Sequence, residues 1–468
     1  MKRLIVNVIM IGLCFSYGLA QGKMTPRTSQ KLEESWKFFR GDTSAYAVDF
    51  DDSRWETVNV PHDWAIYGPF YYGHDLQKVA IAQNFEQAES LKSGRTGGLP
   101  FIGVGWYRTY FNVREYSRDK KVTLLFDGAM SEARVFINGK EAIFWPYGYN
   151  SFYVDVTDLL NGNGQNNVLA VRLQNREQSS RWYPGAGIYR NVHVVVTGKT
   201  HVPVWGTYIT ASDITGDKAG ITLRVTVQGA DDHTEVDTKI LDKEGHMVAF
   251  SKNGTKEGNV YTQHFSVSQP ELWSPEKPYL YSAETKIISR GQTVDVYNTT
   301  FGIRTIEIVP DKGFFLNGEK RKIKGVCNHH DLGPLGAAVN KAAIRRQLSL
   351  LKDMGCDAIR TSHNMPAPEL IELCDEMGFM VMVEPFDEWN IPKTRNGYNR
   401  FFDEWAEKDM VNMIRQYRNN PSVIMWSIGN EVPNQCNPEG YKTAAFLAGI
   451  CRREDPTRPV TCGMDNVM

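Results

Sequence analysis

Apolar and polar positions alternate with a period of two in several short runs before residue 308, which is the pattern of β-strands that bury one face. Residues 221–227 show this alternation cleanly, and residues 133–137 form a shorter run of the same kind. The turn signal Asn138-Gly139 follows that run, and no long helical period interrupts the series. We therefore expect this part of the chain to be rich in β-sheet.

The spacing of strands and turns changes near residue 200, and this change divides the β-rich part into two predicted domains. Residues 21–200 contain short strands separated by turns, and we expect a two-sheet β-sandwich of the jelly-roll type. Residues 201–308 fit about seven strands into about 100 residues, which favours an immunoglobulin-like β-sandwich.

Beyond about residue 313 the sequence pattern changes, because apolar strands now alternate with amphipathic helical segments. This alternation predicts a parallel sheet covered by helices, and we assign it to a third domain, residues 309–468. The predicted strands are residues 321–326, 357–361, 379–384, 423–428 and 460–462, and the predicted helices are residues 340–354, 367–377, 402–417 and 440–453.

Polar clusters at the strand ends distinguish between two parallel folds. A doubly wound sheet also fits the alternation, but functional groups at the carboxyl ends of successive strands are typical of a TIM barrel. A closed (β/α)8 barrel has eight such units, and this stretch supplies about five strands. We therefore expect an incomplete TIM barrel, truncated within that domain. The clusters are residues 328–331, 360–364, 384–389 and 430–431.

Charge and composition exclude some partners. The formal net charge is −1 and no long like-charged run occurs, so we expect no nucleic-acid partner. Aromatic residues make up 12% of the chain, a surplus that serves either sugar stacking or the filling of β-sandwich cores.

The N-terminus has the pattern of a secretory signal. Lys2-Arg3 precede an apolar run, and a small-x-small cleavage site falls at residues 18–20. The run is short for a membrane span, so we expect no transmembrane segment. We predict that residues 1–20 are a signal peptide and that the protein is exported to the periplasm or the medium. A lipid anchor on Cys14 is the alternative, disfavoured by the bulky Leu13.

The strand end at residues 426–431 carries the most specific chemistry. A tight turn is expected at Gly429, and it would present Asn430 and Glu431 at the mouth of the barrel. An amide beside a carboxyl suits glycoside cleavage, in which one group holds a sugar hydroxyl and the other protonates the leaving oxygen. This chemistry also needs a second carboxylate.

Motifs in all three predicted domains together resemble glycoside hydrolase family 2, and the resemblance extends over residues 30–468. Gly-Asn-Glu alone is a weak motif, but its place after a fourth barrel strand and two sandwiches makes it specific. The matching segments are Gly105-Trp106-Tyr107-Arg108, Phe136-Ile137-Asn138-Gly139, residues 181–190, residues 270–281, Phe301-Gly302-Ile303-Arg304, Asn328-His329-His330-Asp331, Arg360-Thr361-Ser362-His363 and residues 426–431.

The resemblance implies a retaining hydrolase with Glu431 as its general acid/base and Asn430 bound to the sugar 2-hydroxyl. It implies a sugar-binding first sandwich and a nucleophile on a seventh strand, which is absent from this chain. Further residues are implied to contact the sugar or support the site. They are His330 and His363 around the sugar, Arg360 beside the nucleophile, Glu384 and Asp387 in support, and Arg181 and Trp182 at the rim.

Several alternatives remain open. Glu431 also fits a helix N-cap, and Arg360 also fits a plain ion pair with Glu384 or Asp387. The strand period turns His329 and His330 in opposite directions, and we expect His330 to face the site. We expect no metal and no cofactor.

The predicted substrate is an oligosaccharide or glycan with a terminal β-linked sugar. An exo-acting β-galactosidase fits best, and an oligomer is compatible with the sequence. The alternatives are a β-glucuronidase, a β-mannosidase or a carbohydrate-binding fragment without catalysis, and we expect these 468 residues alone to be inactive.

Overall fold

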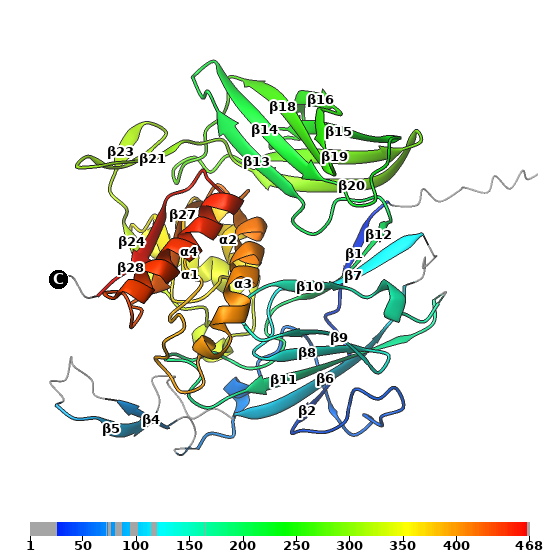
Figure 1. Ribbon diagram of the computed structural model, residues 1–468, viewed down its shortest axis with the longest axis vertical. Helices are drawn as coiled ribbons and strands as arrows, with labels where there is room; N and C mark the ends of the chain where they lie inside the picture. The colour runs from blue at the N-terminus through cyan, green and yellow to red at the C-terminus, as the bar shows by residue number, and fades with distance from the viewer. Residues whose placement is uncertain are drawn as a thin grey trace, which may run out of the picture.

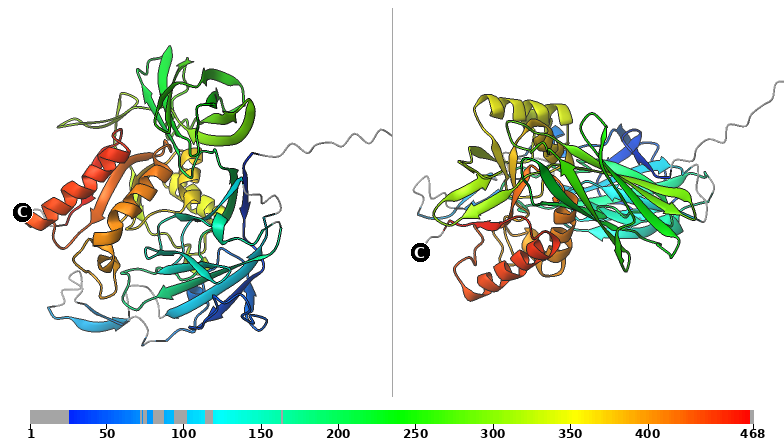
Figure 2. Two further views of the ribbon diagram at one scale, coloured as in Figure 1. Left: turned by 45° about the vertical axis from the view of Figure 1, so that its right-hand side comes forward. Right: turned by 90° about the horizontal axis from the view of Figure 1, so that it is seen from above.

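A computed structural model of the protein describes residues 26–71, 73, 76–79, 87–93, 102–113, 119–162 and 164–465. The predicted signal peptide lies outside these residues. The described part contains two β-sandwiches and a strand–helix domain that lies beside both of them (Figures 1 and 2). No described helix has the length and apolar character needed to cross a membrane.

The first sandwich consists of two antiparallel sheets that enclose an aromatic core with Trp36, Tyr107 and Phe126 at its centre. One sheet has the order β3 (Glu56–Val58), β2 (Trp36–Arg40), β6 (Gly103–Phe111), β11 (Asn167–Asn175), β8 (Ala133–Ile137) and β9 (Lys140–Trp145). The other has the order β1 (Thr28–Lys31), β12 (Val192–Gly198), β7 (Lys120–Phe126) and β10 (Phe152–Asp155).

The second sandwich also pairs two antiparallel sheets, and its strands show the alternating burial that the sequence pattern predicts. One sheet has the order β13 (Thr207–Ser212), β14 (Lys218–Thr226), β18 (Val260–Ser268) and β17 (Thr255–Glu257). The other has the order β16 (Met247–Lys252), β15 (Thr234–Leu241), β19 (Tyr281–Ser289) and β20 (Gln292–Phe301).

The strand–helix domain contains a parallel sheet whose strands lie side by side in chain order. The described strands are β24 (Gly325–Asn328), β25 (Ala358–Thr361), β26 (Met380–Val383), β27 (Val423–Asn430) and β28 (Val460–Gly463). The connecting helices are α1 (Lys341–Asp353), α2 (Pro368–Met377), α3 (Phe402–Tyr417) and α4 (Pro438–Glu454). The predicted alternation of strands and helices is confirmed.

Two small antiparallel units lie outside these sheets. The strands β21 (Ile306–Val309), β22 (Gly313–Leu316) and β23 (Glu319–Arg321) form a meander between the second sandwich and the parallel sheet. The hairpin of β4 (Leu76–Val79) and β5 (Ser90–Ser93) projects away from the first sandwich (Figure 1).

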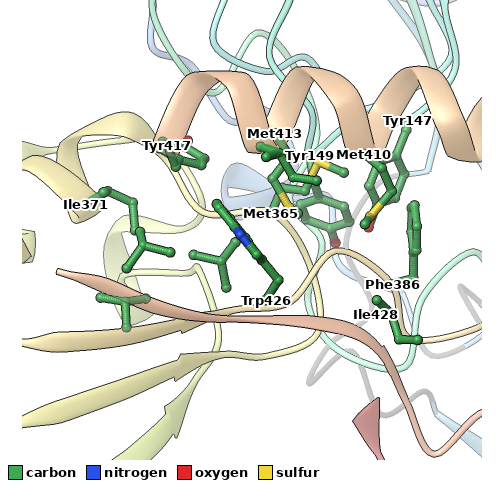
Figure 3. Packing of buried hydrophobic residues seen from close by; sticks show 14 of the residues in the cluster. Tyr147, Tyr149, Met365, Ile371, Phe386, Met410, Met413, Tyr417, Trp426 and Ile428 are labelled. Carbon is green, nitrogen blue, oxygen red and sulfur yellow. The ribbon is translucent and has the colours of Figure 1, made fainter. Parts of the chain in front are cut away.

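The core of the parallel domain continues into the first sandwich. Helix α3 buries a stripe at spacings of three and four that includes Met410, Met413 and Tyr417, and this stripe packs over Trp426 of β27. Tyr147 and Tyr149 of the first sandwich belong to the same cluster, near Met410 and Phe386 (Figure 3). The first sandwich therefore docks by sharing a hydrophobic core with the domain that carries the strand ends.

Two predicted boundaries were wrong. The first parallel strand is Gly325–Asn328, because residues 322–324 are an exposed connection after the meander rather than part of a strand. The expected turn at Gly429 is absent, because β27 continues through Asn430 and keeps its pairing with Gly463 of β28. The chain turns instead at Glu431, whose φ is 45°.

Candidate functional site

Polar side chains at the ends of β25, β26 and β27 and just beyond them meet at the carboxyl edge of the parallel sheet. Parallel pairing places these three strand ends next to one another, so residues distant in sequence become neighbours. Two carboxylates that follow β26, Glu384 and Asp387, are the centres of two separate hydrogen-bond clusters.

Glu384 is fully buried, and both of its oxygens are occupied. One oxygen accepts a hydrogen bond from His363 Nδ1 at 2.6 Å. The other accepts from Arg360 Nη2 at 2.8 Å and from Ser427 Oγ at 2.6 Å. A buried carboxylate needs such partners, because leaving its charge unpaired in the interior is costly. This cluster is built entirely from the parallel domain.

Asp387 joins the two domains. Arg181 of the first sandwich donates two hydrogen bonds to its carboxylate, at 2.7 and 2.6 Å. Lys393 Nζ and Asn430 Nδ2 each donate to Asp387 Oδ1 at 2.9 Å. Burial alone would raise the pKa of Asp387, but Arg181 and Lys393 outweigh it and lower the pKa to about 2. Asp387 is therefore an ionised anchor near neutral pH.

Asn430 connects the two clusters, and its side-chain amide is shared between them. Its Oδ1 accepts from Arg360 Nη2 at 2.7 Å, while its Nδ2 donates to Asp387. Its backbone carbonyl accepts from Lys393 Nζ at 2.7 Å. The side chain is buried, so its position is fixed by these contacts.

Glu431 stands apart from the two buried carboxylates, because its side chain is 44% exposed. Its Oε2 lies 3.8 Å from Arg181 Nη2, and its backbone N donates to Gly463 O at 2.8 Å. Its left-handed backbone is uncommon for a residue other than glycine, and such strain often accompanies functional positions. Of these three carboxylates, Glu431 has the most exposed side chain.

Aromatic rings form a wall beside the Glu384 cluster. The Trp182 ring centroid lies 5.1 Å from that of His329 and 5.9 Å from that of His363. Trp182 Nε1 donates to Tyr149 OH at 2.9 Å, which fixes the indole against the first sandwich. An indole offers a flat apolar surface of the kind on which sugars stack, and the two imidazoles add hydrogen-bonding nitrogens.

The expected orientation of the two neighbouring histidines was wrong. His330 is directed into the interface with the first sandwich, where its Nε2 donates to Pro184 O at 3.0 Å and its ring contacts Tyr149 and Tyr189. Burial and Arg190 lower the pKa of His330 to about 3, so it remains neutral. His329 takes the place beside His363 instead, with 5.7 Å between the ring centroids.

The remaining predicted residues gather at the strand ends, but mostly as partners of one another. Arg360 forms an ion pair with Glu384, which is one of the two partners that the ion-pair alternative named for it. Arg181 forms an ion pair with Asp387. Two residues were missed: Lys393, which lies in the long loop after β26, and Ser427 inside β27. The only signal for Ser427 was that it is a polar residue in the otherwise apolar run 423–428.

Comparisons with protein families agree with this architecture. Residues 307–468 match the model described as "Glycosyl hydrolases family 2, TIM barrel domain", and residues 200–304 match the model "Glycosyl hydrolases family 2". Two sandwiches followed by β/α units with polar strand ends define a multidomain protein with two β domains and one α/β domain. Within that class, the chain belongs to glycoside hydrolase family 2.

Individual relatives extend the match to the first sandwich. A β-galactosidase of Bacteroides ovatus, BoGH2A, is 44% identical over 97% of this chain and 55% of its own length. A β-glucuronidase of Bacteroides fragilis is 30% identical over 84% of this chain and 59% of its own length. The crystal structure of a family 2 member from Bacteroides cellulosilyticus superposes with a TM-score of 0.86 at 34% identity, covering 94% of this chain and 56% of that chain. The chain thus spans about half the length of the relatives it matches.

Proposed function

We propose that this chain is the N-terminal part of a retaining, exo-acting β-galactosidase in which Glu431 is the general acid/base. Glu431 would protonate the glycosidic oxygen and then deprotonate the water that releases the sugar. The single observation that carries the proposal is the end of β27, where a partly exposed carboxylate follows a buried Asn430 whose amide oxygen and nitrogen each hold one hydrogen bond, which leaves further donor and acceptor capacity. Precise placement of the proton donor is what this reaction needs.

The nucleophile would come from a later part of the longer protein. Glu384 is fully buried with both oxygens bound, and Asp387 is held by two cations and an amide. Attack on a sugar carbon requires an oxygen that can reach it, about 5 Å from the acid/base in a retaining enzyme. Neither carboxylate has such an oxygen, so both support the site.

The sugar would be neutral and bound against the aromatic wall. Arg181 and Lys393 pair with Asp387, and Arg360 pairs with Glu384. Each of these three cations is already paired with a carboxylate of the protein, which favours a galactoside over a sugar that carries a carboxylate. The name of the Bacteroides ovatus relative supports the same choice. Asn430 and His363 are the proposed hydroxyl partners.

A β-glucuronidase is the second candidate, since the Bacteroides fragilis relative carries that name. Its sugar carboxylate would need cations from residues outside this chain. A purified full-length protein distinguishes the two when 4-nitrophenyl β-galactoside and 4-nitrophenyl β-glucuronide are assayed side by side. Faster turnover of the glucuronide would overturn the choice of galactose but not the class of reaction.

The role of Glu431 is tested by Glu431→Gln in the full-length protein. We expect the rate to fall by roughly 10²- to 10⁴-fold, the usual contribution of general acid–base catalysis. Glu439→Gln is the matched control, because Glu439 is an exposed carboxylate at the start of α4. Equal activity of Glu431→Gln and wild type would exclude the assignment.

Residues 21–468 alone should bind sugar without turning it over, and turnover by this fragment would contradict the proposed origin of the nucleophile.

The proposal also covers the topology of the three domains and the export of the protein. The first sandwich would have jelly-roll topology and the second immunoglobulin-like topology, with β24 to β28 as consecutive strands of an eight-stranded barrel. The protein would be exported after removal of residues 1–20. Mass spectrometry of the secreted N-terminus would check the last point, with Gln21 expected first.

A further inference from the structure

We propose that Arg181 and Lys393 are positioning residues for Glu431, which act through Asp387 and Asn430 and do not bind the sugar. The inference rests on the proposed function of Glu431. It reassigns Arg181, which the sequence placed at the rim of the sugar site. It also gives a function to Lys393, for which the sequence predicted none.

Asp387 is the carboxylate at which Arg181 and Lys393 meet. Arg181 binds this carboxylate through two parallel hydrogen bonds of 2.7 and 2.6 Å, the arrangement that fixes both partners in direction as well as distance. These bonds occupy the Nε and one Nη of the guanidinium, and the same Nη lies 3.8 Å from Glu431 Oε2. One guanidinium thus contacts the buried anchor and the exposed carboxylate together.

Lys393 links Asp387 to the backbone of Asn430. Its Nζ donates to Asp387 Oδ1 at 2.9 Å and to the Asn430 carbonyl at 2.7 Å. That carbonyl belongs to the peptide that joins Asn430 to Glu431, immediately before the left-handed turn at Glu431. The side chain is only 11% exposed, so its contacts are with protein. Lys393 therefore holds the peptide from which the Glu431 side chain projects.

The loop that carries Arg181 is itself fixed at several points. We call residues 180–187 the docking loop. Tyr183 OH and Ala186 N donate to the buried Asp63 at 2.6 and 2.9 Å, and Ala337 N, in the loop after β24, donates to the same carboxylate at 2.8 Å. Asp63 thus binds both the docking loop and the loop after β24, so Arg181 reaches Asp387 from a rigid support.

The close approach of the two loops leaves little freedom for rearrangement. A Cβ on Gly185 would lie 2.4 Å from Ala337 Cβ, and Gly185 has a left-handed φ of 70°. Only glycine fits this contact. The docking of the first sandwich is therefore tightly coupled to the position of Arg181, and through Asp387 and Asn430 to the strand end at Glu431.

The first test uses the leaving group. Aryl glycosides with a good leaving group, such as 2,4-dinitrophenyl, need little proton donation, whereas phenyl glycosides need it fully. In the full-length protein, we expect Arg181→Met and Lys393→Met to lower kcat/KM, which reports the step that expels the leaving group, roughly 10- to 100-fold on the phenyl substrate. On the dinitrophenyl substrate the loss in kcat/KM should be below about threefold, because expulsion of that leaving group needs little proton donation. The sugar used is whichever one wild type cleaves.

Matched variants separate this role from a structural one. Arg172→Met removes another pair of guanidinium hydrogen bonds, to Asp42 within the first sandwich at 3.0 and 2.7 Å, and should leave both rates unchanged. Arg181→Lys keeps the charge without the paired geometry and should recover part of the phenyl rate. A rise in KM with equal loss on both substrates would show that Arg181 binds sugar, and would overturn the inference.

A second measurement does not depend on turnover. Amide hydrogen exchange in a peptide covering residues 428–432 should be faster in Arg181→Met and Lys393→Met than in wild type or Arg172→Met. Failure of wild type to cleave any glycoside would refute the proposed function alone, and the exchange experiment would still decide the positioning role. Unchanged exchange in both variants would overturn it.

Discussion

Glu384 and Asp387 follow the same strand, β26, yet different parts of the molecule hold them. The partners of Glu384 come from strands β25 and β27 and the residues next to them. Asp387 instead takes its paired hydrogen bonds from Arg181, on the first sandwich. The register of the parallel sheet is sufficient to assemble the first cluster, whereas the second is complete only when the first sandwich docks and brings Arg181 to Asp387.

The largest expected effect is the loss of Glu384. In Glu384→Ala, Arg360 and Ser427 lose a fully buried partner, so we expect the parallel domain to be destabilised by about 4 kcal/mol. Urea unfolding of the wild type and the variant measures this difference. A loss below about 1 kcal/mol would mean that the cluster relaxes into solvent and does not depend on the sheet register.

Asp409 on α3 separates the effect of burial from that of cations. Its carboxylate is buried and accepts hydrogen bonds from Trp145 and Asn150 of the first sandwich and from Tyr398, and no cation among the described residues forms an ion pair with it. Burial outweighs these donors and raises the pKa of Asp409 to about 7. A raised carboxyl pKa stabilises the fold below about pH 4, and this contribution disappears as the pH rises toward 7.

We therefore expect wild type to lose a few kcal/mol of stability between about pH 4 and 7 that Asp409→Asn does not lose. Denaturant midpoints of both proteins across this range provide the measurement. Parallel curves for the two proteins would show that Asp409 ionises freely at the interface.

Asp387 should show the opposite sign. Its pKa falls from the usual 3.8 to about 2, so its contribution is complete above about pH 4 and is lost as the pH falls toward 2. Relative to Asp387→Asn, wild type should lose roughly 2 kcal/mol of stability over that acid range. Acid unfolding followed by tryptophan fluorescence would reveal it. If Asp387 and Asp409 variants shifted the curve in the same direction, the contrast between paired and unpaired burial would fail.

The smallest effect should come from Arg172, which forms the same type of bidentate pair at the surface. Its partner Asp42 has a side chain that is 57% exposed, so we expect Arg172→Met to cost less than about 1 kcal/mol. Arg181→Met should cost more, because the Asp387 side chain is 10% exposed. Thermal melts of the two variants compare them directly, and equal melting temperatures would remove the distinction between the surface and docked pairs.

Much of the parallel domain could be predicted from sequence because its information is local. Helix α3 begins and ends where its apolar spacing indicated, at Phe402 and Tyr417. The polar ends of β25, β26 and β27 also converge as expected, since parallel strands bring their carboxyl ends to one edge. The Glu384 cluster follows from that rule alone.

The errors occur where a distant segment decides the outcome. Period-two alternation correctly separated His329 from His330, but the choice between them depended on Pro184 and Tyr149, which reach His330 from the first sandwich. Lys393 lies in a loop with no periodic pattern, and its role depends on Asp387 and on the Asn430 carbonyl. The first contact arises from docking of the first sandwich and the second from a long loop folding back onto the strand ends, and a local pattern encodes neither.

The left-handed backbone of Glu431 places stability and the proposed activity in opposition at one position. For residues other than glycine this conformation costs about 1–2 kcal/mol, so glycine would suit the backbone better than glutamate. A search for more stable variants would therefore favour Gly at residue 431 and, in the same step, delete the proposed proton donor. Sequence drift toward glycine there would mark a copy of the gene released from selection for catalysis.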